Sequence, residues 1–427
     1  MKLYRMQTTL ATFLLFINIS MGIGSINILT EEDPNLPKNK YLIQLNSSAF
    51  SNSTCLPSSI TNAFVFPRHI SEDEIRIPLE KIKSTKNLFG GEFRTAIEFS
   101  FFPNENWKSH NKCIGFSYSN QQFLNMVFSR DLYKIIMQGN ADFAGKNAVF
   151  DDSRGTSLHY ETIKFHYQQA LNKRQRHFIH FSIGIARGIH YSSFDFSSAN
   201  LFTQETAEYL DFSLNGKIEE SGRNYNKLFS NTLSAGPVAD FKYTLYIKKF
   251  RLNVSAGDLG MLCWNKNSSG IDRDTTFRFK GIQIENVFNL TEAGLISGDS
   301  LLNKFTGKAE NKKLFMPLPA FFSGQFSYDV TEKSSLSAMT SYRFFKGYKP
   351  QIGIAWSSSI LLGKSIKIPY KLQLLYGGWG KFNSALMLTP FQNEKHMLSV
   401  GTLFNEGFIN PKRWSGNGIR INYALHL

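Results

Sequence analysis

Histidines and adjacent carboxylates are the residues whose side chains could do chemistry in this chain. His177, His180 and His190 lie close together, but His180 and His190 are ten positions apart on one predicted strand. Metal ligands occur at shorter spacings, so these histidines are interpreted as polar residues of a strand surface. Asp151-Asp152 and Glu219-Glu220 are interpreted as solvated loop charges rather than as a general acid and base.

Motifs for a catalytic nucleophile or a phosphate-binding loop are also missing. No Gly-x-Ser-x-Gly sequence occurs, so no nucleophile elbow is predicted. The stretch Gly377-Gly378-Trp379-Gly380 lacks the lysine and the following helix of a phosphate loop and is interpreted as a turn. The sequence therefore predicts a protein that is not an enzyme and has no cofactor or metal site.

One short motif, Asp258-Leu259-Gly260 with the nearby Trp264, follows an alternating stretch and has two interpretations. The structural one is a turn that ends a strand, in which Gly260 takes a positive φ. The functional one is a loop contact for a partner or ligand. We expect the turn, and we keep Asp258, Leu259, Gly260 and Trp264 as candidate contact residues.

Long strands are the elements that must position these residues. Apolar residues recur at every second position from Phe93 to the C-terminus, which predicts strands with two different faces. The last strand, from Gly418 to Leu427, ends on an apolar residue and has an apolar face. Such a strand is what the outer-membrane barrel-assembly machinery engages, and Tyr423, Leu425 and Leu427 are the expected contacts.

The N-terminus predicts export. A basic start, an apolar run from Thr9 to Ile19 and small residues up to Gly24 indicate a signal peptide over residues 1–24. No stretch reaches the roughly 20 apolar residues of a membrane helix. Strands can span lipid only as a closed barrel, because every backbone polar group needs a partner there. The sequence thus predicts an all-β transmembrane antiparallel barrel in the cell outer membrane, with about 14 strands in a range of roughly 12–16.

Composition agrees with β structure and argues against nucleic-acid binding. Aromatic residues make up 14% of the chain, and Phe and Tyr suit pleated surfaces and membrane interfaces. The formal net charge of +15 is not gathered into a nucleic-acid-binding motif. The densest basic run, Lys173 to Arg176, lies between two predicted strands and is typical of a hairpin connection. A soluble secreted β-sandwich remains the alternative fold.

The chain divides into three predicted parts after these considerations. Residues 1–24 are the signal peptide, residues 25–90 an irregular segment that could plug or cap the lumen, and residues 91–427 the barrel. Ser129 to Gly139 interrupts the strands and has the capping residues and apolar spacing of a short helix. Cys55 and Cys113 could form a disulfide, or all three cysteines could be unpaired packing residues.

Two stretches resemble a known family. Arg130 to Lys134, with the following Gly139-Asn140 and Phe143-Ala144-Gly145, and Leu252 to Gly260, with Cys263-Trp264, resemble segments of a Bacteroidetes-type outer-membrane barrel family of unknown function. The resemblance covers residues 90–427 and implies a barrel similar in plan to fatty-acid transporters and to type IX secretion barrels. It implies no catalytic residues. The Asn-Pro-Ala motif that often follows the signal peptide in such proteins is absent.

Two functions follow as competing hypotheses. The first is transport of small or hydrophobic compounds in the manner of a porin, motivated by the aromatic-rich strands. The second is a structural or docking barrel for secretion or surface-protein assembly, motivated by the lack of a polar site. The expected partners are outer-membrane lipid, the barrel-assembly machinery and, for the second function, secretion or surface proteins, with no nucleic acid.

Overall fold

The computed structural model describes residues 40–65, 68–103, 112–171, 176–206, 208–221, 234–279, 310–362 and 366–427. The predicted signal peptide and the basic run at 173–175 lie outside these residues. Within the described part, no helix is long and apolar enough to cross a membrane.

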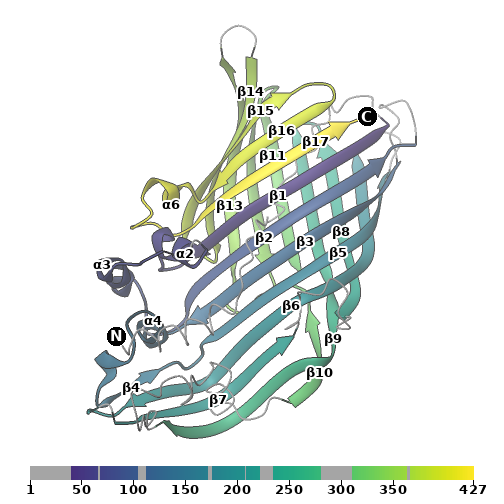
Figure 1. Cartoon of the computed structure of the whole chain (residues 1–427). Coiled ribbons are helices and arrows are strands. Elements are labelled where there is room, and N and C mark those ends of the chain that lie inside the picture. Colours follow the sequence, from purple (N-terminus) through teal and green to yellow (C-terminus); the bar gives the residue numbers. More distant parts are fainter. Residues whose placement is uncertain are drawn as a thin grey trace.

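Fourteen antiparallel strands form a closed barrel, as the sequence predicts, and three further strands extend it (Figure 1). The ring closes because β1 pairs with both β2 and β17, the first and last strands of the wall. The wall consists of β1 (Tyr41–Ser53), β2 (Asn87–Phe101), β3 (Lys112–Phe128), β5 (Arg154–Ala170), β6 (His177–Thr203), β8 (Ser234–Ile247), β9 (Phe250–Phe279), β11 (Phe321–Thr331), β12 (Ser334–Arg343), β13 (Lys349–Leu362), β14 (Ile366–Gly378), β15 (Phe382–Gln392), β16 (His396–Leu403) and β17 (Asn417–His426).

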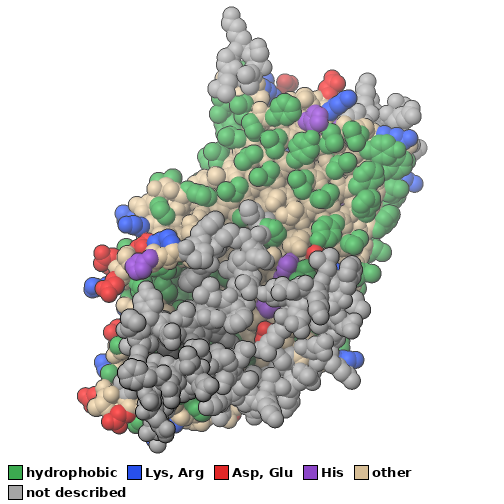
Figure 2. Space-filling view, viewed as in Figure 1, with side chains coloured by type: hydrophobic (Ala, Val, Ile, Leu, Met, Phe, Trp, Pro, Cys, Tyr) green, Lys and Arg blue, Asp and Glu red, His purple; other side chains and the backbone are tan. Residues whose placement is uncertain are grey.

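The alternation along each strand separates an apolar outer wall from a polar interior. On β17, Ile419 and Ile421 are exposed, whereas Arg420 and Asn422 are buried in the lumen. Figure 2 shows the resulting band of apolar side chains over the upper part of the barrel. The predicted faces of the final strand are therefore confirmed, and β17 spans Asn417–His426 rather than Gly418 to Leu427.

The two ends of the barrel differ. At the end that holds the C-terminus, here called the terminal end, the β8–β9, β11–β12 and β15–β16 connections take only two or three residues. At the opposite end, the elaborated end, β6 and β9 continue past the wall and pair with the additional strands. The elements of the elaborated end are α2 (Ser58–Val65), α3 (Glu72–Arg76), η1 (Ile77–Glu80), α4 (Arg130–Gln138), η3 (Ala141–Phe143), β4 (Lys146–Val149), β7 (Leu210–Ser221), β10 (Glu310–Pro317) and α6 (Asn405–Ile409).

The predicted boundary at residue 91 needs correction. Residues 41–53 form a wall strand that pairs with β2 along its whole length, and β2 itself begins at Asn87. The strand pattern is weak in sequence because small or polar residues, Ser47 and Ala49, take outward positions between Leu45 and Phe50. Of the described residues in the predicted N-terminal segment, those between Ser53 and Asn87 connect β1 to β2, and their helices α2 and α3 belong to the elaborated end (Figure 1).

The predicted short helix is confirmed as α4. Ser129 caps its N-terminus by accepting a hydrogen bond from the Leu132 backbone N–H at 3.1 Å, and Gly139 ends it at φ 83°. Cys55 and Cys113 form no disulfide with each other, because Cys55 follows β1 at the elaborated end and Cys113 lies at the start of β3 at the terminal end. The predicted bridge between them is therefore contradicted.

Candidate functional site

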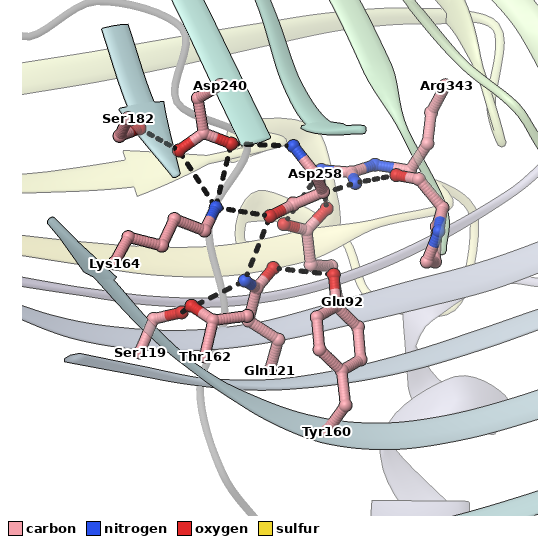
Figure 3. Close-up of polar contacts among 11 residues, drawn as sticks. Glu92, Ser119, Gln121, Tyr160, Thr162, Lys164, Ser182, Asp240, Asp258 and Arg343 are labelled. Atoms are coloured by element: carbon pink, nitrogen blue, oxygen red, sulfur yellow. Dashed lines mark hydrogen bonds and ion pairs between the residues drawn. The ribbon is translucent and has the colours of Figure 1, made fainter. Parts of the chain in front are cut away.

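Six ionisable side chains from five wall strands face the inside of the barrel and form what we call the charge layer. Figure 3 labels all of them except Arg94. Alternation aims them inward, because each occupies a lumen-facing position of its strand. The charge layer comprises Glu92 and Arg94 on β2, Lys164 on β5, Asp240 on β8, Asp258 on β9 and Arg343 on β12.

Lys164 joins two carboxylates on neighbouring strands. Its Nζ donates to both carboxylate oxygens of Asp240, at 2.7 and 2.8 Å, and to Oδ1 of Asp258 at 3.0 Å. Ser182 Oγ also donates to Asp240, at 2.9 Å. Lys164 is 3% exposed and Asp258 is fully buried, so these charges depend on one another rather than on water.

Arg343 joins the opposite side of the lumen to the same layer. Its Nη2 lies 3.1 Å from the Glu92 carboxylate, and its Nη1 lies 4.0 Å from Oδ2 of Asp258. Nη1 also donates to the Pro319 carbonyl at 2.7 Å. The guanidinium lies over the rings of Phe123 and Phe321, a geometry that favours a cation. The charge layer therefore ties β2, β5, β8, β9 and β12 together across the lumen.

A β-bulge places Asp258 in this layer. The pairing of β8 with β9 shifts register between Ala239 and Phe241, and Asp258 takes φ 53° in the left-handed region. The backbone N–H of Asp258 donates to Oδ1 of Asp240 at 2.8 Å. Bulges re-aim side chains in this way, and Asp is among the few residues that tolerate this conformation.

Aromatic side chains fill the lumen on the elaborated side of the charge layer. Phe345, Tyr348 and Trp379, here called the lumen plug, come from connections between wall strands and pack together. Trp379 is anchored by its Nε1, which donates to Asn125 Oδ1 at 2.9 Å. Gly90 makes room for the indole, because a Cβ there would lie 2.1 Å from its Nε1. The charge layer and lumen plug thus place charged and aromatic side chains from different wall strands and connections inside the lumen.

A polar cavity of about 180 Å³ lies on the terminal side of the charge layer. Arg94, Lys164 and Asp240 line it from the layer itself. His166 lines it too, with Nε2 at 3.1 Å from Ser100 Oγ and 3.6 Å from Glu98 Oε1, and His166 stacks on His180. A cavity of this size and polarity holds water or a small hydrophilic solute. Among the residues that the structure describes, no cluster of His, Cys, Asp or Glu could hold a metal ion.

The sequence-predicted contact motif has a different setting from the one expected. Asp258, Leu259 and Gly260 do not end a strand, because β9 continues to Phe279, and the positive φ belongs to Asp258 rather than Gly260. Asp258 and Trp264 are buried in the lumen, with Trp264 stacked on Tyr191. Leu259 points outward and is 39% exposed. The expected turn that ends a strand is thus contradicted, and Asp258 enters the site as a buried charge. Contact of these four residues with a partner or ligand stays a prediction.

The predicted assembly residues lie at the terminal end. Tyr423 faces outward with its hydroxyl 2.7 Å from His396 Nδ1, and Leu427 exchanges two backbone hydrogen bonds with Tyr41. Leu425 occupies the same outward face. Their recognition by the assembly machinery stays a prediction.

Sequence reasoning did not identify five members of the charge layer: Glu92, Arg94, Lys164, Asp240 and Arg343. The signal in the sequence was the presence of charged residues at the inward positions of predicted strands. Small polar residues would be enough to line a water-filled lumen at these positions. Nothing in the sequence pairs positions as distant as Glu92 and Arg343, which meet only when the barrel closes.

Comparison with known proteins gives one family and several distant folds. Residues 35–373 match the profile of a family of unknown function, DUF5723. A search among curated protein sequences found no match. Solved structures similar to this chain include a Pseudomonas aeruginosa FadL homologue, at 9% identity over 95% of this chain and 100% of that one, with a TM-score of 0.45. The toluene transporter TbuX of Ralstonia pickettii is 8% identical over 96% and 97%, with a TM-score of 0.43.

Proposed function

The chain belongs to the DUF5723 family of unknown function, and we propose that it is an outer-membrane barrel that passes small solutes through a gated lumen. The observation that carries the proposal is a polar cavity in the lumen next to a layer of paired charges from different strands. The charge layer and lumen plug form the gate.

The outer wall supports placement in a membrane. Exposed apolar side chains such as Ile163, Ile185 and Ile352 face outward from strands all around the barrel. Tyr41, Phe99 and Phe101 stack at the terminal end, where an aromatic girdle is expected at a membrane interface. The short connections orient the terminal end toward the periplasm and the elaborated end toward the outside.

The charge layer suits a gate because its ion pairs depend on one another. Removing one partner of a buried ion pair destabilises a protein by about 3–5 kcal/mol, so we expect the pairs of the layer to break together or not at all. The polar lining of the cavity favours water-soluble solutes over the hydrophobic compounds that the sequence also admits.

Solute uptake by proteoliposomes tests this function. Trp379→Ala combined with Tyr348→Ala removes the core of the lumen plug, and we expect faster swelling in small sugars and amino acids than with the wild type. Tyr376→Ala, which removes an outward-facing aromatic side chain that is 59% exposed, is the matched control and should behave like the wild type. If neither the wild type nor the plug variant passes any hydrophilic or lipidic solute, the proposal fails.

A docking barrel for secretion or surface-protein assembly is the second candidate. Ile409 in α6 is 81% exposed, and Phe408 and Trp414 beside it are 47% and 45% exposed at the elaborated end. Apolar side chains gathered at one rim favour contact with another protein. A photo-crosslinking residue at position 409 should then capture a specific partner in cells. The same photo-crosslinking residue at position 412, in place of Lys412, gives a second test of this rim. If neither position captures a partner protein, the docking function is contradicted.

A further inference from the structure

Seven consecutive residues at the elaborated end, residues 408–414 and here called the rim segment, are all exposed. The segment begins in α6 and continues toward β17. It contains three large apolar side chains and two cations: Phe408, Ile409, Trp414, Lys412 and Arg413. Apolar, aromatic and basic side chains mixed in one short stretch are typical of protein at a membrane–water interface.

The backbone of the rim segment is held in place although its side chains are exposed. The Trp414 carbonyl accepts a hydrogen bond from the Ser58 backbone N–H of α2 at 2.8 Å. The Arg413 carbonyl accepts a hydrogen bond from Lys81 Nζ at 2.9 Å. Folding therefore fixes the segment and leaves its large apolar side chains uncovered, which marks a binding surface.

The rim segment lies where the apolar outer wall ends. Strand β17 begins at Asn417, three positions after Trp414, and its first outward apolar residue, Ile419, is 43% exposed. A tilted strand of roughly 9–11 residues crosses the hydrocarbon core of a membrane. Since β17 has ten residues, the rim segment adjoins the end of its spanning length, on the side of the elaborated end (Figure 1). Its side chains are then level with the lipid headgroups of the outer leaflet.

The charges of the rim segment favour a lipid surface over a protein as its occupant. The segment carries two adjacent cations, Lys412 and Arg413, and no acidic residue. The acidic residue of α6, Glu406, instead accepts a hydrogen bond at 3.0 Å from the Ser384 backbone N–H on the wall strand β15. Lysine and arginine at the headgroup level attract the anionic groups of lipids, and aromatic side chains beside them settle at the same level.

We propose that the rim segment binds the phosphate-bearing headgroups of outer-leaflet lipid. Lys412 and Arg413 contact the phosphates, for which ammonium and guanidinium groups are suitable donors. Phe408, Ile409 and Trp414 reach the boundary between headgroups and acyl chains. The inference rests on the membrane placement of the proposed function, and it does not depend on solute passage.

Tryptophan quenching tests the position of the rim segment. Full-length protein is inserted into vesicles of phospholipid brominated close to the headgroup, and the emission of Trp414 is the difference between the wild type and Trp414→Phe. We expect this emission to be quenched. Trp356, 37% exposed on the outer wall, is the reference and is isolated in the same way with Trp356→Phe. If Trp356 is quenched and Trp414 is not, the barrel lies in the membrane and the proposal fails. If neither is quenched, the membrane placement fails as well.

Native mass spectrometry of the full-length protein in detergent tests the headgroup chemistry. The wild type should retain added lipid A, which carries phosphates, in preference to dephosphorylated lipid A. Lys412→Gln combined with Arg413→Gln should weaken this retention at least about tenfold. The matched control is Arg130→Gln combined with Lys146→Gln, which removes the same charge from exposed residues at the elaborated end and should retain lipid A like the wild type. Equal losses in the two double variants, or equal retention of the two lipids by the wild type, would overturn the proposal.

Crosslinking at position 409 separates a lipid surface from a protein partner. A photo-crosslinking residue there should form adducts with lipid in cells, detected as the added mass of a lipid on the peptide that contains the label. Capture of a specific protein instead of lipid would overturn the proposal and support the docking function.

Discussion

Asp258 is the central carboxylate of the charge layer. It is fully buried, accepts a hydrogen bond from Lys164 Nζ at 3.0 Å, and lies near Arg343. Asp258 stabilises the layer through its charge rather than its shape, because an asparagine has nearly the same shape and could occupy the same bulge. Removing the charge leaves buried cations short of a partner.

We therefore expect Asp258→Asn to destabilise the barrel by about 3–5 kcal/mol. The measurement is urea-induced unfolding of the protein in lipid vesicles, followed by tryptophan fluorescence. Asp272→Asn is the control, because Asp272 forms an exposed pair with Lys217 at 3.5 Å and should change stability by less than about 1 kcal/mol. Equal effects of the two substitutions would show that the charge layer does not stabilise the fold.

At the scale of single elements, α4 illustrates a segment that local sequence specifies. Ser129 caps the helix, and its hydroxyl also donates to the Val149 carbonyl at 2.7 Å, which ties α4 to β4. Ser129→Ala should lower local stability by about 1 kcal/mol through the lost cap. Hydrogen exchange of the α4 amides should accelerate about fivefold, whereas Ser71→Ala, which uncaps α3, should leave α4 unchanged. Unaltered exchange in α4 would contradict the capping role.

The α3 segment gives a prediction about pH. A hydrogen bond from Arg68 lowers the pKa of Glu74 from 4.5 to about 2, and the two side chains lie 2.8 Å apart. A carboxyl group with a lowered folded-state pKa adds stability above its unfolded pKa, and this stability is lost as pH falls through the folded value. Local stability of residues 68–80 should thus decline from about pH 4.5 to about pH 2.

Limited digestion with pepsin, which is active over this range, measures that decline. Cleavage near residues 68–80 in the wild type should accelerate as the pH falls, relative to cleavage elsewhere. In Arg68→Gln, this cleavage should already be rapid at about pH 4.5 and should change little as the pH falls, because the pKa of Glu74 returns toward its unfolded value and the pH-dependent stability is lost. Identical pH profiles for the two proteins would rule out the Arg68–Glu74 pair as the cause. The effect is modest, because Arg68 is partly exposed to solvent.

The whole molecule is organised by which face of each strand meets lipid. Ile421 on β17 faces outward within the apolar band, 41% exposed, and Val149 on β4 has the same exposure, 40%, beyond the wall. An arginine at the bilayer midplane costs about 2–4 kcal/mol and near or beyond the interface about 0–1 kcal/mol. Ile421→Arg should therefore destabilise the vesicle-inserted barrel far more than Val149→Arg. Heat-modifiable migration on gels and urea unfolding report the difference, and equal costs would argue against the proposed membrane placement.

Much of this architecture is encoded locally. Alternation from Phe93 onward determines the wall strands, their faces and the class of fold, because a period of two is a backbone property. Capping residues determine α4 in the same way, and the two-residue connection after Ile247 marks a hairpin. Strand β1, however, cannot be predicted from its local sequence, because Ser47 and Ala49 interrupt the apolar residues of its outward face. Its strand structure depends on pairing with β2 and β17.

The site was decided by tertiary structure alone. Asp258 looked like part of a turn because its motif ends in glycine, but pairing with β8 makes it a bulge inside a long strand. Glu92 and Arg343 are 251 positions apart, so no local pattern links them. The sequence by itself determined that apolar and polar residues alternate along the strands, and therefore that the chain closes a barrel with an apolar outer surface. Only closure of the ring decided which charges meet in the lumen, because strand order and register, not spacing along the chain, set those distances.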